Sequence, residues 1–169
     1  MKEPLFAATQ ALFTQMNVQL SRLSASQYAR PLEVLSGSSV GMHIRHILEF
    51  YRCLEEQLPS GTVCYDRRRR DPELEHSPQA AQTELLRLEK VIFALPQQPL
   101  QLQMRYDEET ETLETTTQRE LFYTFEHAIH HLALVKIGLR ACFPEVELVP
   151  NLGVAPATQR YLAGKEKEK

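Results

Sequence analysis

The sequence predicts an all-α fold, a four-helix bundle with a short β-hairpin inserted between the third and fourth helices. Three observations lead to this prediction. Four stretches place apolar residues at steps of three and four, the spacing of one helical face. Serine, threonine, proline and glycine residues mark the ends of most of these stretches. One segment between the last two stretches changes to the alternating pattern of a strand.

The first two predicted helices cover about residues 5–23 and 39–58. The apolar face of the first consists of Leu5, Leu12, Met16, Leu20 and Leu23. The apolar face of the second consists of Val40, Ile44, Ile47, Tyr51, Leu54 and Leu58. We expect Ser38 or Ser39 to cap the second helix, and Pro59 and Gly61 to end it.

The third helix is expected from Pro78 to Leu95, with Ser77 as its N-cap and Pro96 as its stop. The fourth begins with residues 117–120, whose spacing is that of a capping box, and ends before Pro144. Its apolar stripe consists of Leu121, Phe125, Ala128, Leu132, Val135 and Leu139. Such sustained spacing is typical of helices packed at a shallow angle in a bundle.

The remaining segments are predicted to be shorter or irregular. Residues 100–106 alternate apolar and polar side chains and residues 110–116 are rich in threonine, so a hairpin turning near 107–109 is expected. Residues 59–76 are expected to form a long polar connection. The chain is expected to be a single domain over 1–169, in which about 160–169 form a frayed tail.

Composition limits the possible classes of function. Lys and Arg number 19 against 22 Asp and Glu, whereas a nucleic-acid binder carries a positive excess, so no nucleic-acid partner is expected. No apolar run reaches the roughly 18 residues of a membrane span, so no membrane partner is expected. Three widely spaced cysteines favour free thiols in a cytoplasmic protein.

A dense basic run, Arg67–Arg70, has two interpretations. Its guanidinium groups would suit a phosphate or carboxylate, because their fork of donors matches such anions. Acidic residues surround the run, however, and no aromatic residues interleave with it. We therefore favour a solvated loop.

Five of the six histidines lie in two short windows of the chain. His127 and His131 are four residues apart, which stacks their side chains on one helical face. Two such imidazoles can point at one ion, and a third from a facing helix would leave coordination positions for water or substrate. Helical angles place His130 on the opposite face. They do not choose between His43 and His46 as the third ligand, and slightly favour His43 as the more inward residue.

Longer motifs accompany these histidines. They are Ser39–His46, Arg45–Tyr51, Tyr65–Arg68, Glu126–Leu134 and Gly153–Thr158. In these motifs, which span most of the chain, the sequence resembles the DinB/YfiT-like superfamily of metalloenzymes, and within it an uncharacterised subgroup. The resemblance implies a four-helix bundle, a homodimer and one divalent metal ion: nickel, zinc or iron. It also implies that the metal ligands are His46, His127 and His131.

Two departures limit what the resemblance implies. Many members follow the last ligand with Arg-Gly-Gln, whereas here His131 is followed by Leu132, Ala133 and Leu134. The relatives with known reactions, thiol-dependent transferases and isomerases, are distant matches. The expected function is therefore a metal-dependent enzyme, either a thiol-dependent transferase or a hydrolase that uses metal-activated water. Its small-molecule substrate and its catalytic residues remain unassigned.

Two expectations concern the surroundings of the metal site. His43 and Glu126 are candidates for a hydrogen bond to the second ring nitrogen of a ligand. Glu49 lies about 160° from the apolar stripe of its helix, which argues against a role at the metal site, and it is expected to be an ordinary helix-surface or packing residue. The alternative function is a non-catalytic dimeric bundle that binds metal incidentally or binds a protein partner. A cavity with convergent polar groups beside the histidines would favour the enzyme.

Overall fold

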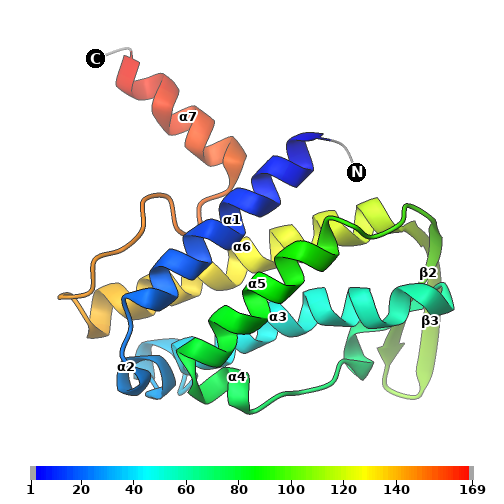
Figure 1. Cartoon of the computed structure of the whole chain (residues 1–169), viewed down its shortest axis with the longest axis horizontal. Helices are drawn as coiled ribbons and strands as arrows, with labels where there is room; N and C mark the ends of the chain where they lie inside the picture. The colour runs from blue at the N-terminus through cyan, green and yellow to red at the C-terminus, as the bar shows by residue number, and fades with distance from the viewer. Residues whose placement is uncertain (1–2, 168–169) are drawn as a thin grey trace.

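Residues 3–167 are described by a computed structural model, and they form a mainly helical fold with one small sheet (Figure 1). The α-helices are α1 (Glu3–Ser21), α2 (Ala25–Ala29), α3 (Val40–Gln57), α4 (Glu73–His76), α5 (Pro78–Ile92), α6 (Thr117–Cys142) and α7 (Pro156–Lys167). The strands are β1 (Thr62–Val63), β2 (Pro99–Tyr106) and β3 (Glu109–Thr116). Short 3₁₀ turns cover Glu33–Leu35, Leu58–Ser60 and Tyr65–Arg67.

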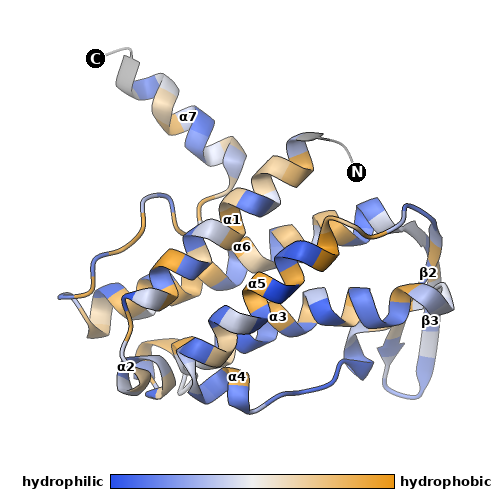
Figure 2. Cartoon of the chain, in the orientation of Figure 1, coloured by the Kyte–Doolittle hydropathy of each residue, from blue (hydrophilic) through white to orange (hydrophobic). Residues whose placement is uncertain are grey.

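The four long helices α1, α3, α5 and α6 lie close to the positions that the sequence predicts. Ser39 caps α3, because its hydroxyl accepts a hydrogen bond from the Met42 amide at 3.0 Å. Ser77 caps α5 in the same way, and the Ala80 amide is the donor at 3.1 Å. Figure 2 shows apolar and polar residues alternating around α3 and α5. The apolar face of α3 packs against α5 and α6, and α1 packs against α5, so these helices share one core.

The start of α6 differs from the prediction by one residue. Thr116 is the N-cap, and its hydroxyl accepts a hydrogen bond from the Arg119 amide at 3.2 Å. The predicted capping box of residues 117–120 is wrong, because β3 runs directly into the helix and Thr116 still has extended backbone. Glu120 is instead buried, where it accepts a hydrogen bond from the Tyr65 hydroxyl at 2.9 Å.

The sheet contains one strand more than the predicted hairpin. β2 and β3 pair in antiparallel fashion between α5 and α6, with Leu102 opposite Leu113. β1 pairs with β2 in parallel, with Thr62 opposite Gln101, so a mainly helical fold carries a small sheet of three strands instead of a two-stranded hairpin. A strand of two residues is too short to show an alternating pattern, which is why the sequence gives no sign of it.

Two segments expected to be irregular contain further helices. The connection 59–76 includes α4, and residues 156–167 form α7, which Figure 1 shows projecting from the body of the protein. A frayed tail was expected from about residue 160; its residues 168–169 lie outside the described part of the chain. α7 lacks a buried stripe, since Tyr161 and Leu162 are exposed, and periodicity therefore did not predict it.

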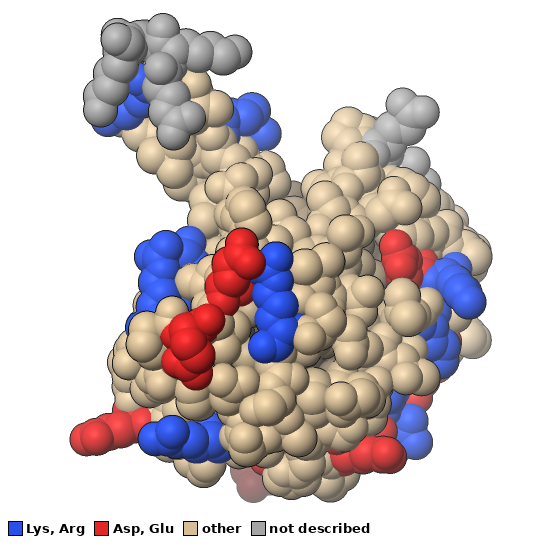
Figure 3. Space-filling view, turned by 60° about the vertical axis from the view of Figure 1, so that its left-hand side comes forward, with Lys and Arg blue, Asp and Glu red and all other residues tan. Residues whose placement is uncertain are grey.

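Several surface features bear on possible partners. Within residues 3–167, no helix is both long enough and apolar enough to cross a membrane. On the face drawn in Figure 3, basic and acidic side chains are interspersed with uncharged ones. Cys53, Cys64 and Cys142 are free thiols, and the first two are buried.

Gly41 lies where α3 approaches α4, and a side chain has no room there. A Cβ atom at this position would overlap the carbonyl oxygen of Glu75 and stand 2.8 Å from Cε1 of Tyr28. We expect Gly41→Ala to lower the free energy of unfolding by about 1–3 kcal/mol, because the added methyl group forces the two helices apart. Urea denaturation followed by circular dichroism measures the change.

The matched control is Gly164→Ala in α7, where an added Cβ meets open space. This variant should lose no stability, because alanine is the better helix former. Equal losses in the two variants would contradict the packing assigned to Gly41.

Candidate metal centre

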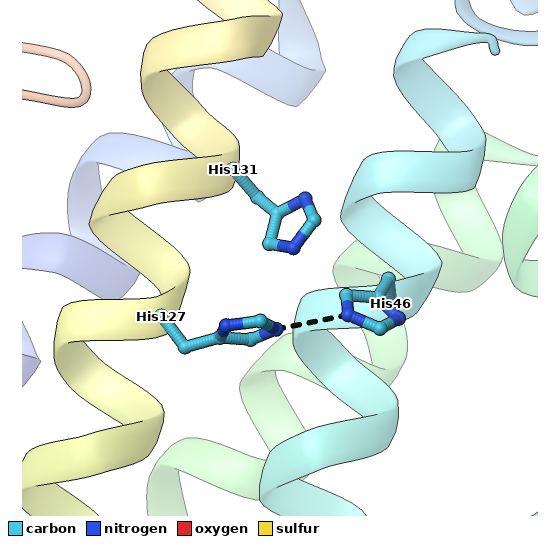
Figure 4. Close-up of side chains that lie close together, drawn as sticks. All are labelled: His46, His127 and His131. Carbon is cyan, nitrogen blue, oxygen red and sulfur yellow. Dashed lines mark hydrogen bonds between the residues drawn. The ribbon is translucent and has the colours of Figure 1, made fainter.

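Helices α3 and α6 bring three histidines together (Figure 4). His46 comes from α3, and His127 and His131 come from successive turns of α6. One ring nitrogen of each lies within 4.8 Å of those of the other two. The Nε2 atoms of His46 and His127 are 2.9 Å apart. All three side chains are half-buried, so the cluster lies in the seam between the helices rather than in open solvent.

The spacing of the cluster fits a single divalent ion. Metal–nitrogen bonds in proteins are about 2.0–2.1 Å long, so two ligand nitrogens lie about 2.9 Å apart at right angles and about 3.3 Å apart in a tetrahedral site. The Nε2 atoms of His46 and His127 lie at the shorter of these separations, which is also a hydrogen-bond distance. In Figure 4 one ring nitrogen of His131 faces the other two rings. Imidazoles suit zinc, nickel and iron, so the three residues fit the metals that the resemblance implies.

Burial favours the neutral form of these imidazoles, which is the form that binds metal. Removal from water lowers the pKa of His46 and of His127 to about 4 and that of His131 to about 3. Positive charge adds to this effect: the Arg68 guanidinium lowers the pKa of His46 further, and His130 and then Arg68 lower that of His127. At neutral pH the three imidazoles are therefore uncharged, and each has one ring nitrogen with a free lone pair.

His43, which helical angles left as an alternative to His46 for the third ligand, contacts one histidine of the cluster. Its Nδ1 atom is 2.9 Å from Nδ1 of His131. Burial lowers the pKa of His43 as well. This contact leaves the other ring nitrogen of His131 free to face His46 and His127, and it fits the role expected of His43.

Two further residues of α6, His130 and Glu126, are exposed. The exposure of His130 agrees with its helical angle, although its ring lies 5.3 Å from the ring of His131. Glu126 is also exposed and lines a surface cavity of about 820 Å³ between α1, α6 and α7. Among the described residues Glu126 has no hydrogen bond to any of the three histidines, since adjacent residues of a helix point about 100° apart. The large cavity and the convergent polar groups of the histidine cluster thus occupy different places.

Arg68 lies against the histidine cluster, which sequence reasoning did not predict. Its Nη2 atom is 3.3 Å from Nδ1 of His46, and its Nη1 atom donates to the Tyr65 carbonyl oxygen at 3.0 Å. Its guanidinium lies over the Phe50 ring, 5.3 Å from the centroid. The side chain is 13% exposed, whereas the other members of Arg67–Arg70 are exposed, so the solvated-loop interpretation is wrong for this arginine.

Glu49, for which the sequence left a helix-surface or a packing position open, is buried. Its side chain is fully buried between two arginines, with Arg68 Nε at 3.4 Å and Arg45 Nε at 3.5 Å. It also accepts a hydrogen bond from the Asp71 amide at 2.8 Å. Its helical angle places Glu49 opposite the apolar stripe of α3, and the segment 65–76 packs on this face and buries it.

Aromatic rings cover one side of His127. Phe50 stacks on it with ring centroids 4.2 Å apart, and Tyr123 stacks on it at 5.7 Å. Tyr65 in turn stacks on Phe50 at 4.7 Å. These contacts restrict the rotation of the His127 imidazole and shield it from water on that side.

Comparisons with known proteins add no relatives to this description: no family model, no curated protein and no solved structure matches the chain. The fold and the cluster therefore define a mainly helical protein with a three-histidine candidate metal site. The resemblance to the DinB/YfiT-like superfamily rests on the motifs of the sequence.

We expect acid to destabilise the metal-free protein through these histidines. The pKa values of His46, His127 and His131 are about 3–4 in the folded chain, against about 6.5 when unfolded. Between these values the unfolded chain binds more protons, so the free energy of unfolding falls as the pH is lowered from about 6.5 towards 4. Urea unfolding at a series of pH values, with a chelator present, measures this slope.

Two variants test whether the slope comes from the cluster. His131→Gln should make the pH dependence shallower, because it removes a group whose pKa is depressed. His130→Gln, on the exposed face of the same helix, should change it less, because it removes only a nearby charge that lowers the pKa of His127 and of His131 and not a buried imidazole. A parent protein that is as stable at about pH 4.5 as at pH 7 would contradict the prediction.

Proposed function

We propose that this protein is a divalent-metal-dependent enzyme of the DinB-like type, with one nickel, zinc or iron ion held by His46, His127 and His131. The observation that supports the proposal most strongly is the convergence of three half-buried imidazoles from two helices. Three protein ligands leave coordination positions for water or substrate, as in catalytic metal sites. The proposed architecture is a four-helix bundle of α1, α3, α5 and α6, with the hairpin β2–β3 inserted before α6.

The proposed chemistry is a thiol-dependent transfer or a hydrolysis of a small molecule. A divalent ion in this position would act as a Lewis acid on water or on a thiol. Three neutral ligands leave the charge of such an ion uncompensated, which favours an anionic fourth partner such as a thiolate. Among the chain's own residues, His43 orients the ring of His131, and Phe50 and Tyr123 keep water from one side of His127.

The proposal extends to the setting of the protein, a cytoplasmic homodimer without nucleic-acid or membrane partners. Free thiols at Cys53, Cys64 and Cys142 are consistent with a reducing compartment. The homodimer rests on the resemblance alone.

A second candidate function is a non-catalytic bundle that binds metal incidentally or binds a protein partner. The cavity of about 820 Å³ between α1, α6 and α7 favours it, because that cavity lies away from the histidines. Phe122, on its lining, is 53% exposed. A bundle of this kind would show no stoichiometric metal that depends on the cluster.

Metal content tests the site that the proposed enzyme requires. Protein purified without a histidine tag, reconstituted and desalted, should contain about one ion per chain, because the three nitrogens form one site. The double variant His127→Ala/His131→Ala should contain almost none. Elemental analysis measures both, and circular dichroism checks that the variant is folded.

His130→Ala is the matched control, since His130 is an exposed histidine on the same helix, and it should keep the metal content of the parent. Substoichiometric metal in the parent, or equal metal in the parent and the double variant, would reject the proposed site.

A further inference from the structure

The contact between Arg68 and His46 determines which nitrogen of this imidazole carries its proton. The Nη2 atom of Arg68 is 3.3 Å from Nδ1 of His46. A guanidinium has only donors, so Nδ1 of His46 must be the acceptor. Because a neutral imidazole carries one proton, that proton is then on Nε2.

The other side of the ring agrees with this assignment. Nε2 of His46 is 2.9 Å from Nε2 of His127, and two unprotonated nitrogens would repel each other at this distance. With its proton on Nε2, His46 donates and His127 accepts. Arg68 therefore donates to His46, and His46 donates to His127. In this arrangement the proton sits on Nε2 of His46, the nitrogen that would otherwise bind a metal ion.

Three further contacts fix the position of the Arg68 side chain. Its Nη1 atom donates to the Tyr65 carbonyl oxygen at 3.0 Å, and its guanidinium lies over the Phe50 ring. Its Nε atom faces the fully buried Glu49 carboxylate at 3.4 Å. A side chain held on three sides loses little further entropy when it bonds to His46.

This arrangement is the reverse of the usual one around a metal ligand. A histidine that binds metal normally donates its second ring N–H to a carboxylate, a carbonyl or water, which raises the basicity of the ligating nitrogen. Arg68 offers a donor instead of an acceptor. It also adds a positive charge next to the position of the proposed cation.

We propose that Arg68 is a positioning residue that holds His46 in the tautomer unable to bind metal through Nε2, and so weakens metal binding by the cluster. The inference rests on the proposed metal site and deepens it. Metal loading then requires Arg68 to leave Nδ1, so that the proton moves there and Nε2 offers its lone pair. Arg68 thereby sets the metal affinity without being a ligand.

The test is the metal affinity of Arg68→Gln, measured with Zn²⁺ alone by competition with a chromophoric chelator on the tag-free full chain. The glutamine side-chain carbonyl can accept a hydrogen bond from Nδ1–H of His46, which is the usual partner of a ligating imidazole. We expect the variant to bind Zn²⁺ about tenfold or more tightly than the parent, the size of effect typical of such partners.

Arg69→Gln is the matched control. Arg69 is the next residue of the same basic run, but its side chain is 66% exposed and pairs with Glu56 at 3.6 Å. The Arg69→Gln variant removes the same charge from the chain without changing a contact of His46. Its Zn²⁺ affinity should therefore equal that of the parent.

A second measurement does not require metal. The ¹⁵N chemical shifts of the His46 ring in metal-free parent protein report its tautomer, with His46→Gln used to assign the signals. We expect the Nε2–H tautomer in the parent and the Nδ1–H tautomer in Arg68→Gln. A purely structural role for Arg68 would leave this tautomer unchanged.

The outcomes separate this inference from the proposed function. An Nδ1–H tautomer in the parent, or a folded Arg68→Gln variant that binds Zn²⁺ no more tightly than a metal-binding parent, overturns the inference alone. Absence of cluster-dependent Zn²⁺ binding in both proteins overturns the inference and the proposed function together. Binding in Arg68→Gln but not in the parent supports the inference and rejects the parent as a metalloenzyme.

Discussion

The packing of α3 against α6 is the constraint on which the rest of the candidate site depends. It places the His46 and His127 ring nitrogens 2.9 Å apart although 81 residues separate them in the chain. Partly buried imidazoles need hydrogen-bond partners or a metal, and here they pair across the seam, His46 with His127 and His43 with His131. The apolar stripes that close the core thus also set the geometry of the cluster.

A second layer, of charged residues, covers the neighbouring face of α3, beside His46. Arg45, Glu49 and Arg52 project from this helix and meet partners from residues 65–76, among them Arg68 on Glu49 and Asp71 on Arg52. A buried charge without a partner costs several kcal/mol, so a segment that covers this face must bring matching charges. That requirement ties the segment 65–76 to α3 and brings Arg68 to the rim of the histidine cluster.

Local patterns in the sequence account for much of the fold. The caps at Ser39 and Ser77, the stripes of the four long helices and the β2–β3 hairpin depend on neighbours within a few residues, and they were predicted. β1 needs a partner strand remote in sequence, and α7 has no buried stripe, so neither left a periodic signal. Thr116 replaced Thr117 as the cap of α6 because the hairpin determines where extended backbone ends.

The sequence by itself determined the long helices, the pairing of His127 with His131 on one face of α6 and the exposure of His130, because helical geometry relates residues a few positions apart. His46 was chosen as the third histidine only through a family resemblance. The tertiary structure alone decided that His43 bonds to His131, that Glu49 is buried and that Arg68 donates to His46. The physical reason is that these contacts depend on which distant segment packs on each helix face. The pattern of residues within one helix does not indicate which segment that is.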